Sequence, residues 1–217
     1  MKEDVSSRIC VSISKTPAQE ILKELRGIKM AEIRLDGANF TSEEIRELFS
    51  VPVRTIATCR PGRLRDGDRM NLLLEAIEAG AAYVDIEVNS RKSYREKIIR
   101  EARRNGCKVI ISYHNERFTP PDDFLLKIAE RFRQMGGDIL KIACRANTVS
   151  DSVRLLCLLN RLENTVVVGM GEKGKITRIA APMMGAPFTY ASLSKGKETA
   201  EGQIEFRKMV KLMDSII

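Results

Sequence analysis

The stretch from Lys108 to Ala143, KVIISYHNERFTPPDDFLLKIAERFRQMGGDILKIA, decides the fold. It begins with an apolar run that is typical of a buried strand and continues with an amphipathic helical pattern. The pair Gly136-Gly137 ends that helical pattern, and a second strand-like run starts at Asp138. A strand, a helix and another strand form the repeating unit of parallel sheets, so this stretch predicts an α/β protein.

The same alternation continues in both directions along the 217 residues, with one strand-like run in roughly every 25 to 30 residues. Each run is followed by a helical pattern, and no linker or shift in composition divides the chain. Eight such units predict a single (β/α)8 barrel domain over residues 1–217, because an open doubly wound sheet usually has fewer strands. The eight strand candidates are Arg8 to Ile13, Ala31 to Leu35, Arg54 to Cys59, Tyr83 to Val88, Lys108 to Tyr113, Ile139 to Ala143, Thr165 to Val168 and Phe188 to Ala191.

Three of the helices are predicted to begin at a capping box, in which a hydroxyl and a Glu or Gln three residues later satisfy free backbone N–H groups. The three pairs are Thr16 with Gln19, Thr41 with Glu44, and Ser93 with Glu96.

The composition excludes several classes of protein. With 43% hydrophobic and 30% charged residues, the chain has the composition of a folded globular protein. It has no run of about 18 apolar residues and no charged-then-apolar leader, so we expect no membrane association and a cytoplasmic location. The five cysteines are odd in number and lack the paired spacing of a zinc site, which predicts free, mostly buried thiols and no metal.

The net charge of +8 raises the alternative of a nucleic-acid-binding protein. Acidic residues are interleaved with the cations, and aromatic residues make up only 5% of the chain. Solvated helix faces are therefore the better explanation, and we expect no nucleic-acid partner. A positive charge also suits a small anionic substrate.

The segment Gly169 to Gly174 matches the dinucleotide-binding pattern G-x-G-x-x-G directly after a strand candidate. Its context disfavours a nucleotide, because it lies in the seventh unit and no strand-ending carboxylate follows about 20 residues later to hold a ribose. In a barrel, the loop after strand seven lines the site and often contacts an anion through backbone N–H groups.

Two residues indicate the chemistry of the site. Lys141 lies inside an apolar run, where a lysine either extends to solvent or serves as an amine for covalent chemistry with a carbonyl. His114, the one histidine, ends another strand candidate and is either structural or a general base. Side chains at the carboxyl ends of barrel strands converge on one site, so the pair suggests an imine-forming enzyme with its own base.

Further polar residues are expected at the same mouth: Ser12, Glu32, Arg34, Arg60 and Arg178. Glu32 and Arg34 share one face of a strand that should otherwise be apolar. They form either an internal ion pair that closes the barrel end, or a carboxylate and a guanidinium that hold a polyhydroxylated substrate.

Taken together, these residues resemble a known family, the type I 3-dehydroquinate dehydratases of the shikimate pathway. The resemblance runs from Ile9 to Gln203 and implies a (β/α)8 barrel. Its markers are Val11-Ser12, Glu32-Ile33-Arg34-Leu35-Asp36, Thr58-Cys59-Arg60, Ser112-Tyr113-His114-Asn115, Lys141-Ile142-Ala143, Thr177-Arg178 and Gly202-Gln203.

The resemblance implies a role for each residue and requires no cofactor. Lys141 would form an imine with the C3 ketone of 3-dehydroquinate, and His114 would remove the C2 proton and then protonate the departing C1 hydroxyl. Arg178 would bind the substrate carboxylate, and Glu32, Arg34 and Arg60 would bind the ring hydroxyls. The three arginines would also favour the neutral form of the lysine amine.

Two more roles come from the loops. The family closes the loop after strand eight over the substrate with a serine and a glutamine, which implies substrate contacts for Thr199 and Gln203. The family also orients the histidine with a glutamate four residues after the arginine of strand three, where this chain has Leu64. Asp66 is the substitute expected from the sequence.

One alternative enzyme stays open at this point: a class I aldolase, which also uses a lysine imine in a barrel. It predicts a sugar phosphate substrate and a phosphate bound by Gly169 to Gly174. The oligomeric state, with a homodimer as one candidate, and the choice between biosynthesis and quinate breakdown also stay open.

Overall fold

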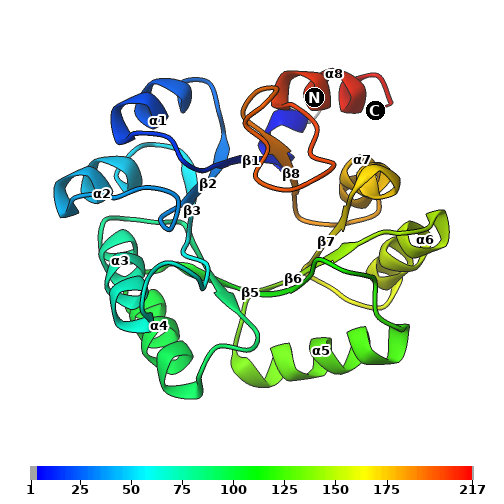
Figure 1. Cartoon of the computed structure of the whole chain (residues 1–217), viewed down its shortest axis with the longest axis horizontal. Coiled ribbons are helices and arrows are strands. Elements are labelled where there is room, and N and C mark those ends of the chain that lie inside the picture. The colour runs from blue at the N-terminus through cyan, green and yellow to red at the C-terminus, as the bar shows by residue number, and fades with distance from the viewer. Residues whose placement is uncertain (1–3, 217) are drawn as a thin grey trace.

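The computed structural model describes residues 4–216. Eight strands form a central ring, and the helices lie around it (Figure 1). The strands are β1 (Ile9–Ile13), β2 (Met30–Arg34), β3 (Arg54–Thr58), β4 (Tyr83–Glu87), β5 (Lys108–Asn115), β6 (Ile139–Arg145), β7 (Thr165–Met170) and β8 (Thr189–Ser192). The helices are α1 (Ala18–Glu24), α2 (Ser42–Phe49), α3 (Asp66–Glu78), α4 (Lys92–Arg104), α5 (Asp122–Met135), α6 (Val149–Cys157), α7 (Lys175–Met183) and α8 (Phe206–Asp214), with short 3₁₀ helices η1 (Val5–Arg8), η2 (Leu158–Asn160) and η3 (Glu172–Gly174).

The strands follow one another around the ring in parallel. Each strand from β1 to β6 pairs with the next one along the chain, and β8 returns to pair with β1. Within the described residues no ladder joins β7 to β8, so the ring is nearly closed. This is the (β/α)8 TIM barrel that the sequence predicted, and every strand lies within two residues of its predicted bounds.

The alternation of side chains along each strand separates two cores. The outward residues of the strands pack against the helices, whereas the inward residues fill the barrel with Cys10, Met30, Ile56, Ile110 and Val166 among others. On several strands the inward-facing side chains are apolar at the start and polar at the carboxyl end. On β2, for example, Met30 is followed by Glu32 and Arg34. The apolar floor of the barrel therefore supports a polar mouth.

Of the three predicted capping boxes, only the one at Thr41 and Glu44 forms. Helix α1 instead follows Pro17, and α4 begins after Arg91 without a side-chain cap. The structure contains a capping box that the sequence reasoning missed, between Thr148 and Asp151, because an aspartate takes the place of the expected glutamate.

Four of the cysteines, Cys10, Cys59, Cys107 and Cys144, are buried and Cys157 is exposed, and all five are free thiols as predicted. Among residues 4–216 there is no group of His, Cys, Asp and Glu side chains that could hold a metal ion. None of the helices in this range is long and apolar enough to span a membrane.

Candidate active site

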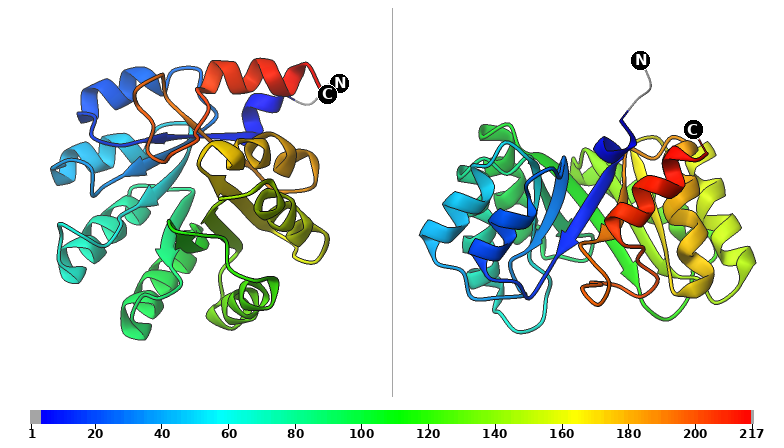
Figure 2. Two further views of the ribbon diagram at one scale, coloured as in Figure 1. Left: turned by 45° about the vertical axis from the view of Figure 1, so that its right-hand side comes forward. Right: turned by 90° about the horizontal axis from the view of Figure 1, so that it is seen from above.

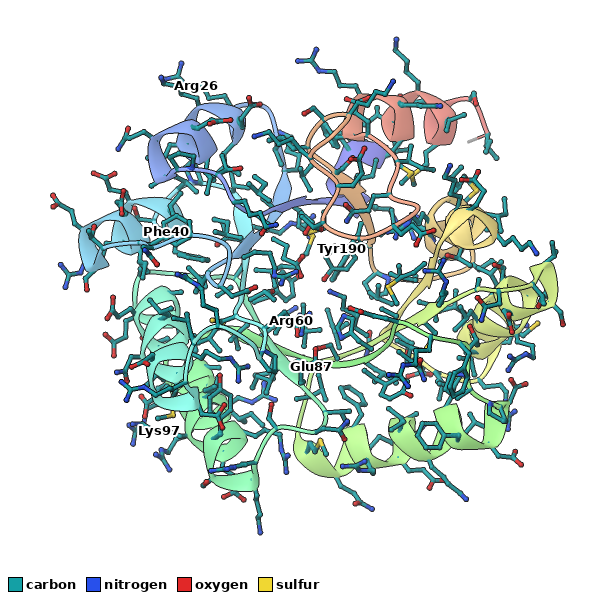
Figure 3. The ribbon with its side chains drawn as sticks, viewed as in Figure 1. Arg26, Phe40, Arg60, Glu87, Lys97 and Tyr190 are labelled. Carbon is teal, nitrogen blue, oxygen red and sulfur yellow. The ribbon has the colours of Figure 1, made fainter. Side chains whose placement is uncertain are left out.

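The polar mouth encloses a cavity of about 730 Å³ at the carboxyl ends of the strands. The loop that follows β8, drawn in orange, lies at this end, opposite η1 (Figure 2). Arg60, Glu87 and Tyr190 lie near the centre of the ring (Figure 3). The predicted site residues that line this cavity are Glu32, Arg34, Arg60, Asp66, His114, Lys141, Arg178, Thr199 and Gln203.

Lys141 is 5% exposed at the base of this cavity, so the lysine does not extend to solvent. Its Nζ lies 3.2 Å from Oε1 of Glu32 and 3.4 Å from Oδ2 of Asp85, and 3.9 Å from the centre of the Tyr190 ring. The sequence reasoning expected arginines beside this amine. Its direct partners are instead two carboxylates and an aromatic face, and Arg34 and Arg60 are themselves paired with carboxylates.

Glu32 lies at the centre of a small hydrogen-bond network. Besides Lys141, it accepts hydrogen bonds from Ser12 at 2.5 Å and from Thr58 at 3.1 Å. Burial by itself would raise the pKa of Glu32, but the charges of Lys141 and Arg60 outweigh burial and lower this pKa. Glu32 is therefore an ionised acceptor.

Arg34 does not pair with Glu32, although both residues point to the same side of β2. Its guanidinium forms a bidentate pair with Asp36, at 3.0 and 2.7 Å. Asp36 also accepts the backbone N–H of Arg60 at 2.9 Å, so it links the ends of β2 and β3.

Arg60 is enclosed by acidic groups from β4. It forms a bidentate pair with Asp85, at 2.8 and 2.9 Å, and its Nη1 lies 2.7 Å from Glu87 and 2.9 Å from Ser112. Burial opposes the charge of Arg60, but Asp85 and Glu87 overcome this effect and raise its pKa. Burial would likewise raise the pKa of Asp85, yet Arg60 and Lys141 hold it well below its usual range.

His114 contacts Glu87, and this finding corrects the prediction of Asp66. Nδ1 of His114 lies 2.8 Å from Oε1 of Glu87. Asp66 begins helix α3, is half exposed, and pairs with Arg69 at 3.0 Å, so its carboxylate is committed to a neighbour on its own helix. The histidine partner therefore comes from the neighbouring strand rather than from the loop after β3.

Arg178 is the largest fully buried side chain of the described residues. Its hydrogen bonds, 3.3 Å to the carbonyl of Tyr190 and 3.4 Å to that of Glu201, are long, and no carboxylate within residues 4–216 pairs with it. Because only burial acts on this group, the pKa of Arg178 falls to about 10. A buried cation without a counterion, on the wall of a cavity, is a ready site for an anion.

The loop after β8 is docked over the mouth. Thr199 donates a hydrogen bond of 2.8 Å to Ser12, and the amide of Gln203 bonds both the backbone N–H and the hydroxyl of Thr199, at 2.7 and 3.0 Å. The two residues predicted to contact substrate thus lie together at the cavity wall.

The sequence reasoning missed two inward carboxylates, Asp85 and Glu87. They alternate with Val84 and Ile86 on β4, which is the same period-two signal that identified Glu32 and Arg34 on β2. Tyr190 was also missed, and its inward position next to Lys141 has no comparable signal in the sequence.

The glycine motif after β7 does not form a free cradle for a phosphate. The N–H groups of Gly169, Gly171 and Gly174 bond to Thr177, Glu201 and Gly171 respectively. A Cβ on Gly174 would lie 2.3 Å from the backbone of Gly169, so Gly169 and Gly174 are required for close packing. This removes the structural basis on which the aldolase alternative depended.

The fold and the site define the class of the protein: a (β/α)8-barrel enzyme whose mouth contains a buried lysine, a histidine and an unpaired arginine. Residues 9–216 match the family model described as Type I 3-dehydroquinase. The chain therefore belongs to the type I 3-dehydroquinase family, and the predicted family and hydro-lyase class are confirmed.

Individual relatives agree with this assignment. The chain is 37% identical to the 3-dehydroquinate dehydratase of Methanothermobacter thermautotrophicus, over 95% of this chain and 97% of the relative. The crystal structure of the 3-dehydroquinate dehydratase from Aquifex aeolicus superimposes with a TM-score of 0.83 at 33% identity, over 95% and 97% of the two chains. A deoxyribose phosphate aldolase from Aeropyrum pernix shares the fold, with a TM-score of 0.65 and 16% identity over 98% and 92% of the chains.

Proposed function

We propose that this chain converts 3-dehydroquinate to 3-dehydroshikimate and water through an imine between Lys141 and the C3 ketone. The observation that carries the proposal is the placement of a buried amine, the one histidine and an unpaired buried arginine around one cavity. The substrate is a small cyclic ketone with one carboxylate and several hydroxyls. Each of these groups has a complementary residue in the cavity.

Arg178 binds the substrate carboxylate in this proposal. The substrate supplies the counterion that this guanidinium does not have in the protein, and two parallel N–H···O bonds replace its long contacts to carbonyl oxygens. Docking the carboxylate there orients the ring, while Glu32, Arg34 and Arg60 contact the ring hydroxyls.

The chemistry begins at Lys141. The ammonium transfers a proton to a neighbouring carboxylate, for which Glu32 and Asp85 are in contact, and the neutral amine then attacks C3. The resulting carbinolamine loses water and becomes an iminium ion. This ion withdraws electrons from C2, so the C2 proton becomes acidic.

His114 accepts the C2 proton, and the electron pair moves toward the iminium nitrogen to form an enamine. The enamine then expels the C1 hydroxyl as water, which takes its proton from the His114 imidazolium. Hydrolysis of the remaining iminium consumes one water and releases 3-dehydroshikimate and the free amine. One water is released overall, and no oxidant, reductant or metal takes part.

Trapping with borohydride tests the proposal. Purified protein is incubated with 3-dehydroquinate and sodium borohydride, and digested for mass spectrometry; product formation is followed separately by the absorbance of the conjugated enone. We expect an adduct on Lys141 and loss of activity in wild type, whereas Lys141→Ala should give neither the adduct nor the enone product. Lys108→Arg, at the exposed start of β5, is the matched control and should behave as wild type. Absence of enone in wild type would reject the function, and an adduct on another lysine would reject the role of Lys141.

A homodimer and a cytoplasmic location complete the proposal. Light scattering coupled to size exclusion at several protein concentrations tests the assembly directly. A monomer at every concentration would exclude the dimer without changing the catalytic proposal.

A further inference from the structure

The carboxylate of Glu87 is shared between the histidine and an arginine. Its Oε1 lies 2.8 Å from Nδ1 of His114 and 2.7 Å from Nη1 of Arg60. The histidine contact is within hydrogen-bond distance but is not linear. Hydrogen bonds of catalytic groups are often bent in the free protein and tighten when substrate binds.

Among residues 4–216, Glu87 is the one acidic residue whose carboxylate lies within ion-pair distance of a ring nitrogen of His114. The charged groups that face this ring are Arg60 from the end of β3, Asp85 and Glu87 from β4, and Lys141 from β6. The cavity wall around it also carries Asp66 and Arg69 of α3, Arg91 before α4 and Glu116 after β5. Of the acidic groups among these, only Glu87 lies within ion-pair distance of a ring nitrogen.

A neutral imidazole carries one proton, which resides on either Nδ1 or Nε2. A carboxylate in contact with Nδ1 favours the tautomer in which Nδ1 is protonated, and this leaves the lone pair on Nε2. A general base for the proposed reaction needs a lone pair directed at substrate. The contact with Glu87 therefore selects the form of His114 that can act.

We propose that Glu87 is a positioning residue that fixes His114 as the Nδ1–H tautomer and stabilises its imidazolium during the proposed reaction. The proposal rests on the proposed function. The C2 proton adds to Nε2 and leaves from Nε2 to the departing hydroxyl, while the Nδ1 proton stays on the ring. Glu87 remains a carboxylate throughout and accepts hydrogen bonds without taking a proton.

The electrostatics of the cluster agree with these assignments. Burial would raise the pKa of Glu87, but the hydrogen bond to His114 and the charge of Arg60 outweigh it, so Glu87 is ionised. Burial and the charge of Arg60 lower the pKa of His114, while Glu87 opposes them. The histidine is thus neutral at pH 7 and ready to accept a proton, and its imidazolium has one adjacent counterion.

Two substitutions separate the charge of Glu87 from its hydrogen bond. In Glu87→Gln, Arg60 still requires an acceptor at the same atom position, so the amide oxygen faces both Arg60 and His114. This variant keeps the tautomer and loses the charge. Glu87→Ala loses both. Asp66→Asn tests the position that sequence reasoning preferred, and Asp68→Asn, an exposed residue of the same helix, is the matched control.

Nuclear magnetic resonance reports the tautomer directly, because the chain contains a single histidine. With ¹⁵N-labelled histidine, we expect the Nδ1–H form in wild type, Glu87→Gln, Asp66→Asn and Asp68→Asn. Glu87→Ala should lose this preference. Titration of the same signals should show a lower His114 pKa in Glu87→Gln than in wild type, because the imidazolium has lost its counterion. These measurements do not depend on turnover.

Kinetics supply the second test. We expect kcat to fall by about 10- to 10²-fold in Glu87→Gln and by about 10²- to 10⁴-fold in Glu87→Ala. In Glu87→Gln the acid limb of kcat/KM should move to lower pH, because a less basic histidine stays unprotonated to lower pH. Borohydride should still trap substrate on Lys141 in both variants, which shows that the site is folded and that imine formation is intact.

Several outcomes would overturn the role of Glu87. An Nε2–H tautomer in wild type would do so, as would an acid limb that does not move in Glu87→Gln, or an Asp66→Asn variant that shows these changes instead. If wild type gives no enone product, the proposed function fails, while the tautomer of His114 is still measured. The two failures are therefore distinguishable.

Discussion

Thr199 and Ser12 are 187 positions apart in the chain, and their hydroxyl oxygens lie 2.8 Å from each other. The Ser12 hydroxyl in turn donates a hydrogen bond of 2.5 Å to Glu32, and the other oxygen of Glu32 lies 3.2 Å from the amine of Lys141. A chain of three contacts thus connects the loop over the mouth to the amine at the base of the cavity. The loop over the mouth and the amine at the base of the cavity are therefore linked by hydrogen bonds through Glu32.

The first prediction concerns Gln203, which bonds Thr199 through both atoms of its amide. Gln203→Ala should lose about 1 to 3 kcal/mol of transition-state stabilisation, read from kcat/KM, because Thr199 and the substrate lose a fixed partner. The free energy of unfolding should change by less than about 1 kcal/mol, because the residue is part of a surface loop. Lys195→Gln on the same loop is the control. A loss of stability equal to the loss in kcat/KM would assign Gln203 a structural role.

The second prediction separates the two catalytic residues. His114→Ala should still accumulate a borohydride-trappable imine, because Lys141 carries out the attack. Turnover should fall by about 10² to 10⁴ or more, because no other group is placed to remove the C2 proton. Rapid-quench mass spectrometry measures the imine and enone absorbance measures turnover. Near-normal turnover in this variant would mean that the histidine is structural.

The third prediction concerns the stability cost of Arg178. A buried guanidinium without a counterion is unfavourable, so Arg178→Met should raise the free energy of unfolding by about 1 kcal/mol or more. The same change should remove the carboxylate site and raise KM for substrate strongly. Urea unfolding and steady-state kinetics measure the two effects. A variant that is both less stable and normal in KM would contradict the assignment of Arg178 to the substrate carboxylate.

The fourth prediction follows from Asp85, whose pKa is lowered in the folded state. The stability that this group contributes is fully present above its unfolded pKa of about 4 and is lost as pH falls toward its folded value. Asp85→Asn removes a buried negative charge that contacts both cations and leaves Arg60 with Glu87 and Lys141 with Glu32, so it should cost roughly 3 kcal/mol at pH 7. The difference between the two proteins should shrink between about pH 4 and pH 2. Urea unfolding at pH 7, 5, 4 and 3 tests this, and a constant difference would refute it.

The fold could be predicted from the sequence because the periodic pattern of apolar and polar residues is enough to place the strands and helices. Each of the eight strand candidates lies within two residues of an observed strand, and the inward positions of Glu32, Lys141 and His114 follow from the alternation. The ion pairs of the site are less predictable than the fold. Arg34 pairs with Asp36 two residues further along, and Arg60 pairs with Asp85 and Glu87 of the neighbouring β4. Lys141 contacts Glu32 of β2 and Asp85 of β4 across the barrel interior, so which carboxylate each cation meets depends on barrel stagger.

Asp66 shows where the sequence reasoning failed. The prediction placed the histidine partner in the loop after β3, where the family has a glutamate, although Asp85 and Glu87 lie on one face of β4. A polar alternation in a strand covered by helices was the stronger physical signal. It pointed to the same mouth without any assumption about loop length.

Two glycines of the loop after β8 offer a matched pair for a final prediction. Gly202 and Gly196 both have positive φ, at 80° and 85°, so alanine meets similar backbone strain at each. Their surroundings differ. A Cβ on Gly202 would lie 2.4 Å from the carbonyl oxygen of Gly171, whereas a Cβ on Gly196 has nothing within 4 Å. Only the first substitution should force the loop away from β7.

Displacement of the loop after β8 should change both the kinetics of the enzyme and its cleavage by trypsin. Glu201 accepts the N–H of Gly171 at 3.1 Å and pairs with Arg145 at 2.7 Å, and both contacts depend on the close approach of Gly202. Gly202→Ala should therefore lower kcat/KM by about tenfold or more, because Thr199 and Gln203 no longer reach the cavity. Gly196→Ala should stay within about threefold of wild type in kcat/KM.

Trypsin cleavage at the exposed Lys195 and Lys197 should be suppressed by bound product in wild type and in Gly196→Ala. Product should not suppress cleavage in Gly202→Ala, because it cannot hold a loop that is sterically displaced. Equal protection of both variants would mean that this segment does not close over the substrate.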